Sequence, residues 1–135
     1  LAAGYERALL VPGDTPLLDP GELAGLIAGT RAVVIVPDRH GSGTNALVLS
    51  PPDAIEPSFG PGSFARHVAA AESAGVPHRV EAVPTLALDV DTPDDLAELA
   101  AVLDGRRGQA PSTRGALRQL DRAGAWTPRM AHASA

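Results

Sequence analysis

Short apolar runs alternate with helix signals along this chain of 135 residues, and no other feature of the sequence constrains the fold as strongly. Apolar runs that end at turn residues are typical of buried strands. The expected strands are Arg7–Pro12, Ala32–Val36, Ala46–Leu49, Arg79–Val83 and Leu86–Val90. The expected helices are Gly21–Ala28, Ser63–Ala74, Thr92 to about Leu103, and Thr113–Arg122. This alternation predicts an α/β fold whose mostly parallel sheet carries helices on both faces.

Capping signals mark where two of the helices begin. Asp19 is expected at the N-cap of the first helix, with Pro20 at its first helical position. Thr92 is expected to form a capping box with Asp95, three residues further on. Residues 123–135 are expected to be a frayed tail.

The composition excludes several classes of protein. Without cysteine there are no disulfides and no thiolate metal sites. No apolar run approaches the roughly 20 residues that span a bilayer, so no membrane partner is expected. The net charge of −5 argues against a nucleic-acid partner. A cytoplasmic protein is expected, because the first residues do not match a signal peptide and the sequence has neither cysteine nor a membrane-spanning run. All 11 basic residues are arginine, so a side-chain contact to a phosphate is expected from arginine or through a metal.

Two aspartates in the segment LALDVDTPDD indicate a metal site. In a strand, residues two apart point to one face, so Asp89 and Asp91 would project together. Paired carboxylates suit Mg²⁺, above all when substrate phosphates complete its coordination. The alternative is that these acids only cap the next helix. Thr92 and Asp95 already supply that cap, which favours the metal interpretation for Asp89 and Asp91.

A third aspartate follows the first expected strand. Asp14 lies in the sequence Gly-Asp-Thr-Pro, which is ordinary turn chemistry when taken alone. Ligands of open α/β sheets collect at the carboxyl ends of parallel strands, however. If Asp14 lies next to the segment of Asp89 and Asp91, three carboxylates converge on one point.

Two glycine-rich segments offer backbone N–H groups to an anion. The loop His40–Asn45 either binds a small anion through its N–H groups and the hydroxyls of Ser42 and Thr44, or is a flexible hairpin. The segment FGPGS places Ser63 at the expected N-cap of a helix, whose N-terminus also attracts anions. His67 on that helix is either a solvent-exposed side chain or a functional one.

Four ordered motifs together resemble a known family, the 2-phospho-L-lactate and phosphoenolpyruvate guanylyltransferases of deazaflavin coenzyme F-420 biosynthesis. The motifs are PGDTP at Pro12–Pro16, PDRHGSGTNAL at Pro37–Leu47, FGPGSFARH at Phe59–His67 and LDVDTP at Leu88–Pro93. The resemblance covers about Ala8–Leu103. It implies a fold similar to the glycosyltransferase-A type nucleotidyltransferases, here incomplete at the N-terminus.

The resemblance also implies a reaction and a set of site residues. The phosphate of phosphoenolpyruvate or 2-phospho-L-lactate attacks the α-phosphorus of GTP and expels pyrophosphate. By resemblance, Asp14, Asp89 and Asp91 are the catalytic Mg²⁺ ligands. Thr44, Gly60 and Ser63 contact the three-carbon acid, and a homodimer is one assembly that the resemblance allows.

The resemblance does not include the family's N-terminal nucleotide loop. Residues 1–105 are therefore interpreted as the C-terminal part of a nucleotidyltransferase domain, and residues 106–135 as a C-terminal helix and tail. The chain alone is then expected to lack GTP-dependent turnover. The alternatives are another nucleotidyltransferase similar to the molybdopterin-guanine-dinucleotide enzymes, and a non-catalytic chain that binds a phosphorylated acid or a partner chain.

Overall fold

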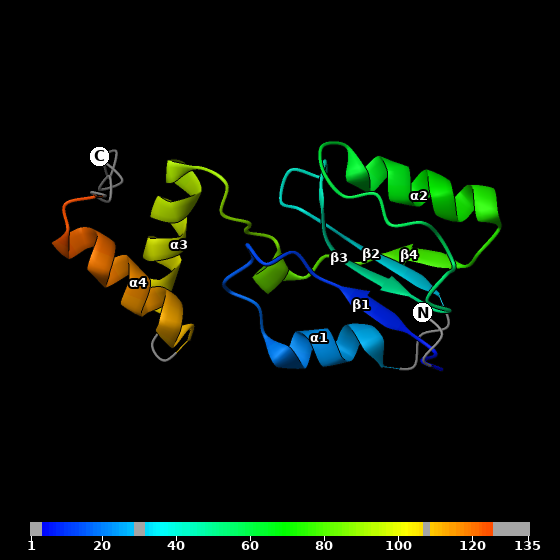
Figure 1. Cartoon of the computed structure of the whole chain (residues 1–135), viewed down its shortest axis with the longest axis horizontal. Coiled ribbons are helices and arrows are strands. Elements are labelled where there is room, and N and C mark those ends of the chain that lie inside the picture. Colours follow the sequence, from blue (N-terminus) through cyan, green and yellow to red (C-terminus); the bar gives the residue numbers. More distant parts are fainter. Residues whose placement is uncertain (1–3, 29–31, 107–108, 126–135) are drawn as a thin grey trace. The chain divides into compact units, whose positions relative to one another are not determined.

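The computed structural model describes residues 4–28, 32–106 and 109–125 (Figure 1). The chain divides into two compact units, Leu1–Asp89 and Val90–Ala135. The elements of the first unit are β1 (Ala8–Leu10), α1 (Pro20–Ile27), β2 (Val33–Pro37), β3 (Thr44–Leu49), α2 (Ser63–Ala74), β4 (His78–Val80) and the short 3₁₀ helix η1 (Pro84–Leu86). The second unit contains α3 (Pro93–Gly105) and α4 (Pro111–Arg122). Of the expected tail, 123–135, residues 126–135 lie outside the described residues.

The sheet of the first unit is mixed, so the prediction of a mostly parallel sheet was wrong. Its strand order is β1-β3-β2-β4, and β3 runs antiparallel to both of its neighbours. Only β2 and β4 pair in parallel. The physical reason is the short connection between β2 and β3, which permits a hairpin but no crossover. The connection from β3 to β4 contains α2 and brings β4 to the free edge of β2.

The pairing has a consequence for where loops gather. Since β1 and β2 both run antiparallel to β3, and β4 runs parallel to β2, three strands point the same way. The carboxyl ends of β1, β2 and β4 therefore share one edge of the sheet with the beginning of β3, and Figure 1 shows η1 at this end as well. An edge of this kind is where α/β sheets collect ligands.

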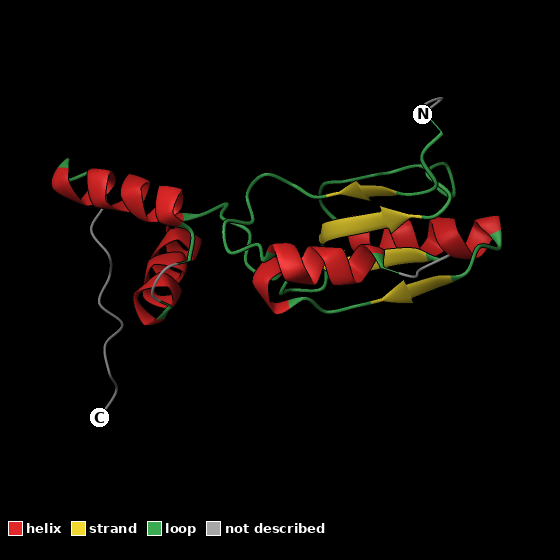
Figure 2. Ribbon diagram, turned by 90° about the horizontal axis from the view of Figure 1, so that it is seen from below, coloured by secondary structure: helices red, strands yellow, loops and turns green. Residues whose placement is uncertain are grey.

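One helix covers each face of the sheet, as the sequence predicted (Figures 1 and 2). On one face, Leu23 and Leu26 of α1 pack with Val34, Val36 and Val48. The other face carries α2, whose packing residues are Phe64, Val68, Ala70 and Ala71, against Val33, Ile35, Leu47 and Leu49. Both faces of β2 and β3 are buried, which explains why these strands read as continuous apolar runs rather than alternating ones.

The caps of α1 and α3 are confirmed. The Asp19 carboxylate accepts from the N–H groups of Gly21 and Glu22, at 2.8 and 3.1 Å. Thr92 and Asp95 form the capping box of α3, with the Asp95 N–H 3.2 Å from the Thr92 hydroxyl. These short-range contacts depend on local sequence alone, which is why the sequence located them.

The predicted cap of α2 was wrong. Gly62 is its N-cap, in a left-handed conformation with φ of 72°, and Ser63 is the first helical residue. No side chain accepts a hydrogen bond at this cap. A left-handed N-cap suits glycine because it has no Cβ to clash with the backbone.

The predicted strand Leu86–Val90 was also wrong. The segment starts in η1 and continues without regular structure. Its carbonyl groups have other partners: the Asn45 side chain donates to Leu86 O at 2.7 Å, and the Arg39 N–H donates to Ala87 O at 3.2 Å. The alternation that placed Asp89 and Asp91 on one strand face therefore does not apply.

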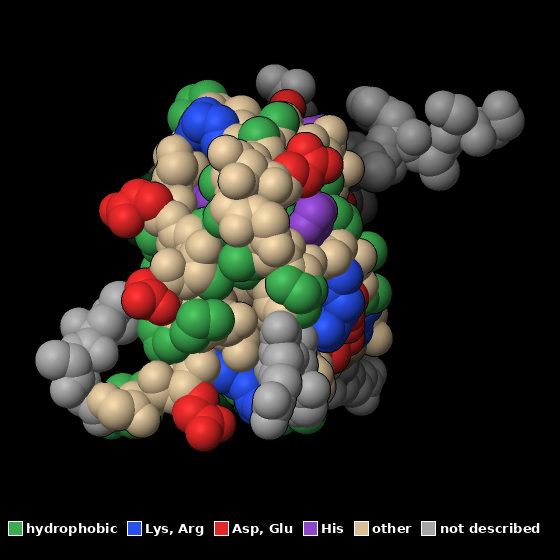
Figure 3. Space-filling model, turned by 90° about the vertical axis from the view of Figure 1, so that its right-hand side faces the viewer, with side chains coloured by type: hydrophobic (Ala, Val, Ile, Leu, Met, Phe, Trp, Pro, Cys, Tyr) green, Lys and Arg blue, Asp and Glu red, His purple; other side chains and the backbone are tan. Residues whose placement is uncertain are grey.

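In the described part of the chain, no helix is both long and apolar enough to cross a bilayer. Figure 3 shows one face of the molecule, where the coloured acidic and basic side chains are interspersed. On the described residues of that face, the basic side chains do not form a continuous stripe of the kind that nucleic-acid backbones select.

Candidate functional site

Two loops lie at the end of the sheet where β1, β2 and β4 finish. The first, Asp38–Gly43, joins β2 to β3, and the second, Ser58–Gly62, leads into α2. The Phe64 N–H donates to Ser42 O at 3.2 Å and joins the two loops. We call the two loops, together with Thr44, Ser63, Arg66 and the buried His67, the polar edge.

The first loop is closed around the carboxylate of Asp38. One carboxylate oxygen accepts from the N–H groups of His40 and Ser42, at 3.0 and 2.9 Å. The other accepts from the Gly43 N–H at 2.7 Å and from the Ser42 hydroxyl at 3.1 Å. A Cβ atom on Gly43 would lie 2.7 Å from that second oxygen, so a larger residue there would displace the carboxylate from its donors. The chain itself supplies the anion that this loop holds.

This arrangement disfavours one of the two interpretations of the glycine-rich loop, in which its N–H groups bind an external anion, because Asp38 already occupies them. Partial burial opposes the charge of Asp38, but the hydrogen bonds from Ser42, Gly43 and His40 outweigh it and lower the pKa of Asp38 below 3.8. The carboxylate therefore stays ionised and keeps these donors occupied. A second anion would meet repulsion from Asp38.

The second loop has the opposite polarity. The guanidinium of Arg66 donates to the carbonyls of Ser58, Phe59 and Pro61. The Gly60 carbonyl accepts from the Ser63 N–H at 3.0 Å, and the Gly62 carbonyl accepts from the Arg66 N–H at 3.3 Å. Every carbonyl from Ser58 to Gly62 is therefore occupied by the chain.

The backbone groups left over in this loop are donors. Within the described residues, the N–H groups of Phe59, Gly60 and Gly62 form no hydrogen bond, and all three residues are exposed. Pro61 has no N–H. Adjacent unpaired N–H groups form a concave site that attracts carboxylate or phosphate oxygens.

His67 connects this loop to β3. Its Nε2 lies 2.9 Å from the N–H of Ser58, and its Nδ1 lies 2.9 Å from the hydroxyl of Thr44. Its ring meets Phe59 edge-on, with the two ring centroids 5.3 Å apart. His67 is fully buried, which excludes the interpretation of a solvent-exposed side chain.

Burial lowers the pKa of His67 below 6.5, and the positive charge of the neighbouring Arg66 lowers it further. The ring is thus held neutral. This agrees with its contact to the Ser58 N–H, because only an unprotonated Nε2 accepts a hydrogen bond.

The predicted acid-binding residues lie on adjoining segments of the polar edge. Thr44 begins β3 and contacts His67. Gly60 lies in the donor-rich loop with φ of 97°, and its carbonyl accepts from Ser63. Ser63 and His67 are one turn apart on the buried face of α2. The structure thus brings all three together, while their contact with an acid stays a prediction.

The three predicted metal ligands occupy different settings. Asp14 is exposed in the turn after β1, and Asp89 is half-buried at the end of the first unit. Asp91 is exposed in the second unit, where its N–H donates to Asp95 at 3.2 Å. Within the described residues their three carboxylates form no hydrogen bonds. No three His, Asp or Glu side chains of the described residues are grouped closely enough to hold a metal, and the assignment stays a prediction.

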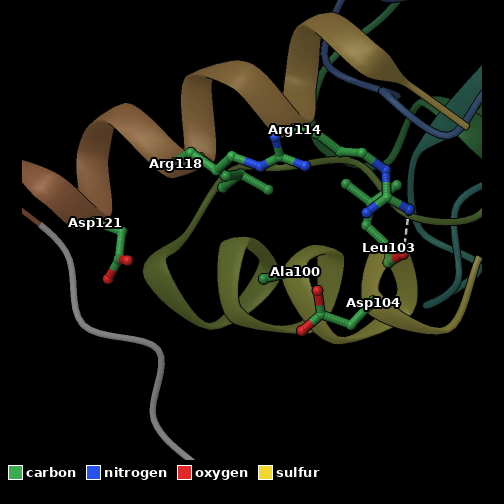
Figure 4. A pocket seen from close by; sticks show the side chains of 7 residues that line it. Ala100, Leu103, Asp104, Arg114, Arg118 and Asp121 are labelled. Atoms are coloured by element: carbon green, nitrogen blue, oxygen red, sulfur yellow. Dashed lines mark hydrogen bonds between the residues drawn. The ribbon is translucent and has the colours of Figure 1, made fainter. Parts of the chain in front are cut away.

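A concavity in the second unit has a structural explanation (Figure 4). It measures about 200 Å³ and is lined by residues of α3 and α4, including Asp104, Arg118 and Asp121. Arg114 above it donates to the carbonyls of Leu103, Arg106 and Gln109 and so closes the C-terminal end of α3. The volume lies below the roughly 300 Å³ at which ligand pockets begin.

A family model described as "Guanylyl transferase CofC like" matches residues 2–121. The chain belongs to this family. It is 53% identical to a phosphoenolpyruvate guanylyltransferase of Conexibacter woesei over 87% of the chain and 54% of that relative. It is also 40% identical to a 3-phospho-D-glycerate guanylyltransferase of Colwellia psychrerythraea, over 73% of the chain and 48% of the relative. A 2-phospho-L-lactate guanylyltransferase of Methanothermobacter thermautotrophicus is 32% identical, over 88% and 51%.

The chain spans about half the length of these curated relatives. The relatives differ in the acid that their names give, while all are named as guanylyltransferases. Family membership confirms the resemblance that the four motifs indicated.

Three residues hold the loops of the polar edge in place through hydrogen bonds that the sequence did not indicate. Asp38 and Arg66 stood in the motifs without an assigned role, and His67 had two open interpretations. For Asp38 the available signal was its position before Gly41 and Gly43, since an acid ahead of a glycine turn often caps backbone N–H groups. For Arg66 and His67 no local signal exists, because their partners in the Ser58–Gly62 loop precede them by up to nine residues.

Proposed function

We propose that this chain supplies the acid-binding part of a guanylyltransferase that transfers GMP from GTP to a phosphorylated three-carbon acid and releases pyrophosphate. The observation that carries the proposal is the polarity of the Ser58–Gly62 loop, whose carbonyls are all occupied and whose free backbone groups are N–H donors. A small acid with carboxylate and phosphate oxygens needs donors of this kind. The names of the relatives supply the reaction class.

In this reaction, a phosphate oxygen of the acid forms a bond to the α-phosphorus of GTP. The bond between that phosphorus and the oxygen bridging to the β-phosphate breaks, and pyrophosphate leaves with the electron pair. The acid must be held so that its phosphate, and not its carboxylate, faces the nucleotide. We assign this positioning to Thr44, Gly60 and Ser63, through hydroxyl and backbone N–H donors.

We further propose Asp14, Asp89 and Asp91 as carboxylate ligands for Mg²⁺. Their carboxylates form no hydrogen bonds within the described residues, and hard oxygen donors suit this ion. A bound Mg²⁺ would neutralise charge on the phosphates as pyrophosphate leaves. The whole domain's glycosyltransferase-A-like arrangement, a role in deazaflavin coenzyme biosynthesis, a cytoplasmic location and pairing of two copies rest on family membership alone.

Pyrophosphate release tests the proposal. GTP is combined with phosphoenolpyruvate, 2-phospho-L-lactate or 3-phospho-D-glycerate, with and without Mg²⁺. The protein is assayed alone and joined to the part of the Conexibacter woesei relative that it does not match. We expect acid-dependent and Mg²⁺-dependent release from the joined protein.

Two controls decide the result. The complete relative must be active under the same conditions, and the joined protein must be folded. If it then releases no pyrophosphate with any of the three acids, the proposal fails. An Asp91→Asn variant of the joined protein should lose activity by about 10²-fold or more while remaining folded, and retained activity at saturating Mg²⁺ would remove Asp91 from the metal site.

A further inference from the structure

The hydrogen bonds around His67 determine which ring nitrogen carries the proton. The Ser58 N–H can only donate, so Nε2 at 2.9 Å must accept and carries no proton. A neutral imidazole carries its one proton on the other nitrogen. Nδ1–H therefore donates to the Thr44 hydroxyl oxygen at 2.9 Å.

This direction has a consequence for Thr44. Because its oxygen accepts from His67, its own hydrogen is free to be donated elsewhere. Thr44 is nearly buried, at 4% exposure, and among the described residues its hydroxyl has no hydrogen-bond partner other than His67, so this hydrogen remains for a bound ligand. With the opposite tautomer the Thr44 hydrogen would point to His67, and lone pairs would face the ligand. Those lone pairs would repel a carboxylate or phosphate oxygen.

We propose that His67 is a positioning residue that turns the Thr44 hydroxyl into an obligatory donor to the anionic acid and ties it to the Ser58–Gly62 loop. This inference rests on the proposed function, since it names what sets the polarity of one acid contact. The His67 ring is fully buried and forms hydrogen bonds both to Thr44 and to the Ser58–Gly62 loop, so it fixes their relative positions. Among the described residues, Arg66 is the charged group that acts on the ring, and its charge disfavours a second proton.

The tautomer is tested first on the chain itself. Long-range ¹H–¹⁵N spectra of the four histidines distinguish a proton on Nδ1 from one on Nε2, and a His67→Asn variant assigns the His67 signal. We expect Nδ1–H, retained as the pH falls below 6.5, where an ordinary histidine gains its second proton. A proton on Nε2, or a doubly protonated ring near neutral pH, overturns the inference.

Acid affinity tests the second half, by NMR titration of the chain with phosphoenolpyruvate, 2-phospho-L-lactate and 3-phospho-D-glycerate. Thr44→Val and His67→Gln should each weaken binding about tenfold, and the double variant should be no weaker than either single one. His67→Asn keeps an N–H near the position of Nδ1 and should stay within about threefold of wild type. His78→Asn is the matched control, since His78 lies on β4 outside these contacts.

A purely structural histidine gives a different pattern. Affinity would then follow the thermal stability of each variant, Asn and Gln would act alike, and the losses at Thr44 and His67 would add. That pattern, with acid binding intact in wild type, overturns this inference alone. If wild type binds none of the three acids, the acid contact assigned under the proposed function fails as well, and the inference falls with it.

Discussion

Two glycine-containing loops at the same edge of the sheet have opposite electrostatic designs. The loop Asp38–Gly43 turns its N–H groups inward to its own carboxylate. The loop Ser58–Gly62 turns its carbonyls to Arg66 and leaves N–H groups unpaired within the described residues. The sequence left anion binding open for both loops, and the N–H groups unpaired within the described residues favour the second.

The difference shows that glycine content alone does not make an anion site. What matters is whether a loop already contains the charge that its donors would seek. Asp38 fills the first loop with a negative charge, whereas the positive charge of Arg66 occupies the acceptors of the second. The same backbone chemistry therefore gives a closed structural turn in one place and, within the described residues, a set of unpaired N–H donors in the other.

Removal of Arg66 should have the largest effect on this comparison. In an Arg66→Ala variant the carbonyls of Ser58, Phe59 and Pro61 lose their donor, and the loop is free to turn them toward the ligand. Because the guanidinium is exposed, the free energy of unfolding should fall by only about 1–2 kcal/mol. Affinity for phosphoenolpyruvate should fall about thirtyfold, measured by NMR titration. An exposed arginine of α4, changed in Arg122→Ala, is the control; equal affinities of the two variants would contradict the role of Arg66.

A matched pair of glycine substitutions compares the two loops directly. Gly41 and Gly60 both have positive φ, 69° and 97°, and an added Cβ would meet no atom within 4 Å at either. Alanine should therefore cost each loop about 1 kcal/mol of stability through backbone strain alone. Only Gly60→Ala should weaken acid binding, by about tenfold. Similar affinity losses in both variants would show that the loops do not differ as described.

The smallest effect is expected from neutralising the carboxylate of the first loop. Asp38→Asn should lower the free energy of unfolding by about 1 kcal/mol at neutral pH and leave acid affinity unchanged. Because folding lowers the pKa of Asp38, its stabilisation is present above pH 3.8 and is lost as the pH falls through the lower folded value. Denaturant unfolding between about pH 7 and pH 2.5 should show that loss in wild type and not in the variant.

The exposed Asp53 provides the control for this measurement, as Asp53→Asn. If Asp38→Asn loses as much stability at low pH as wild type does, the Asp38 carboxylate is not what closes the loop. If acid binding improves strongly instead, the first loop is an anion site that Asp38 had blocked.

Local sequence was sufficient for features whose partners lie within a few residues. The caps at Asp19 and Thr92, the span of α2 and the end of that helix at Gly75 were all predicted correctly. The failures had distant causes. The strand expected at Leu86–Val90 is absent because Asn45 and Arg39, more than 40 residues earlier, bond its carbonyls.

The candidate site likewise contains residues that the structure brings together and residues that stay predictions. The motifs identified the family and placed Thr44, Gly60 and Ser63 among the candidates, and the structure gathers their segments at the polar edge. Asp14, Asp89 and Asp91 stay predictions, because the strand geometry that paired two of them does not exist.

By itself, the sequence determined the α/β class, the coverage of both sheet faces and the family. Apolar periodicity and ordered motifs depend only on the order of residues along the chain. The tertiary structure alone decided which loop leaves N–H groups unpaired within the described residues, since that depends on where the charges of Asp38 and Arg66 lie. It also decided the orientation of the Thr44 hydroxyl. That orientation follows from a buried His67 whose two nitrogens meet residues far from it in the chain, and hydrogen-bond direction is fixed only when both partners are in place.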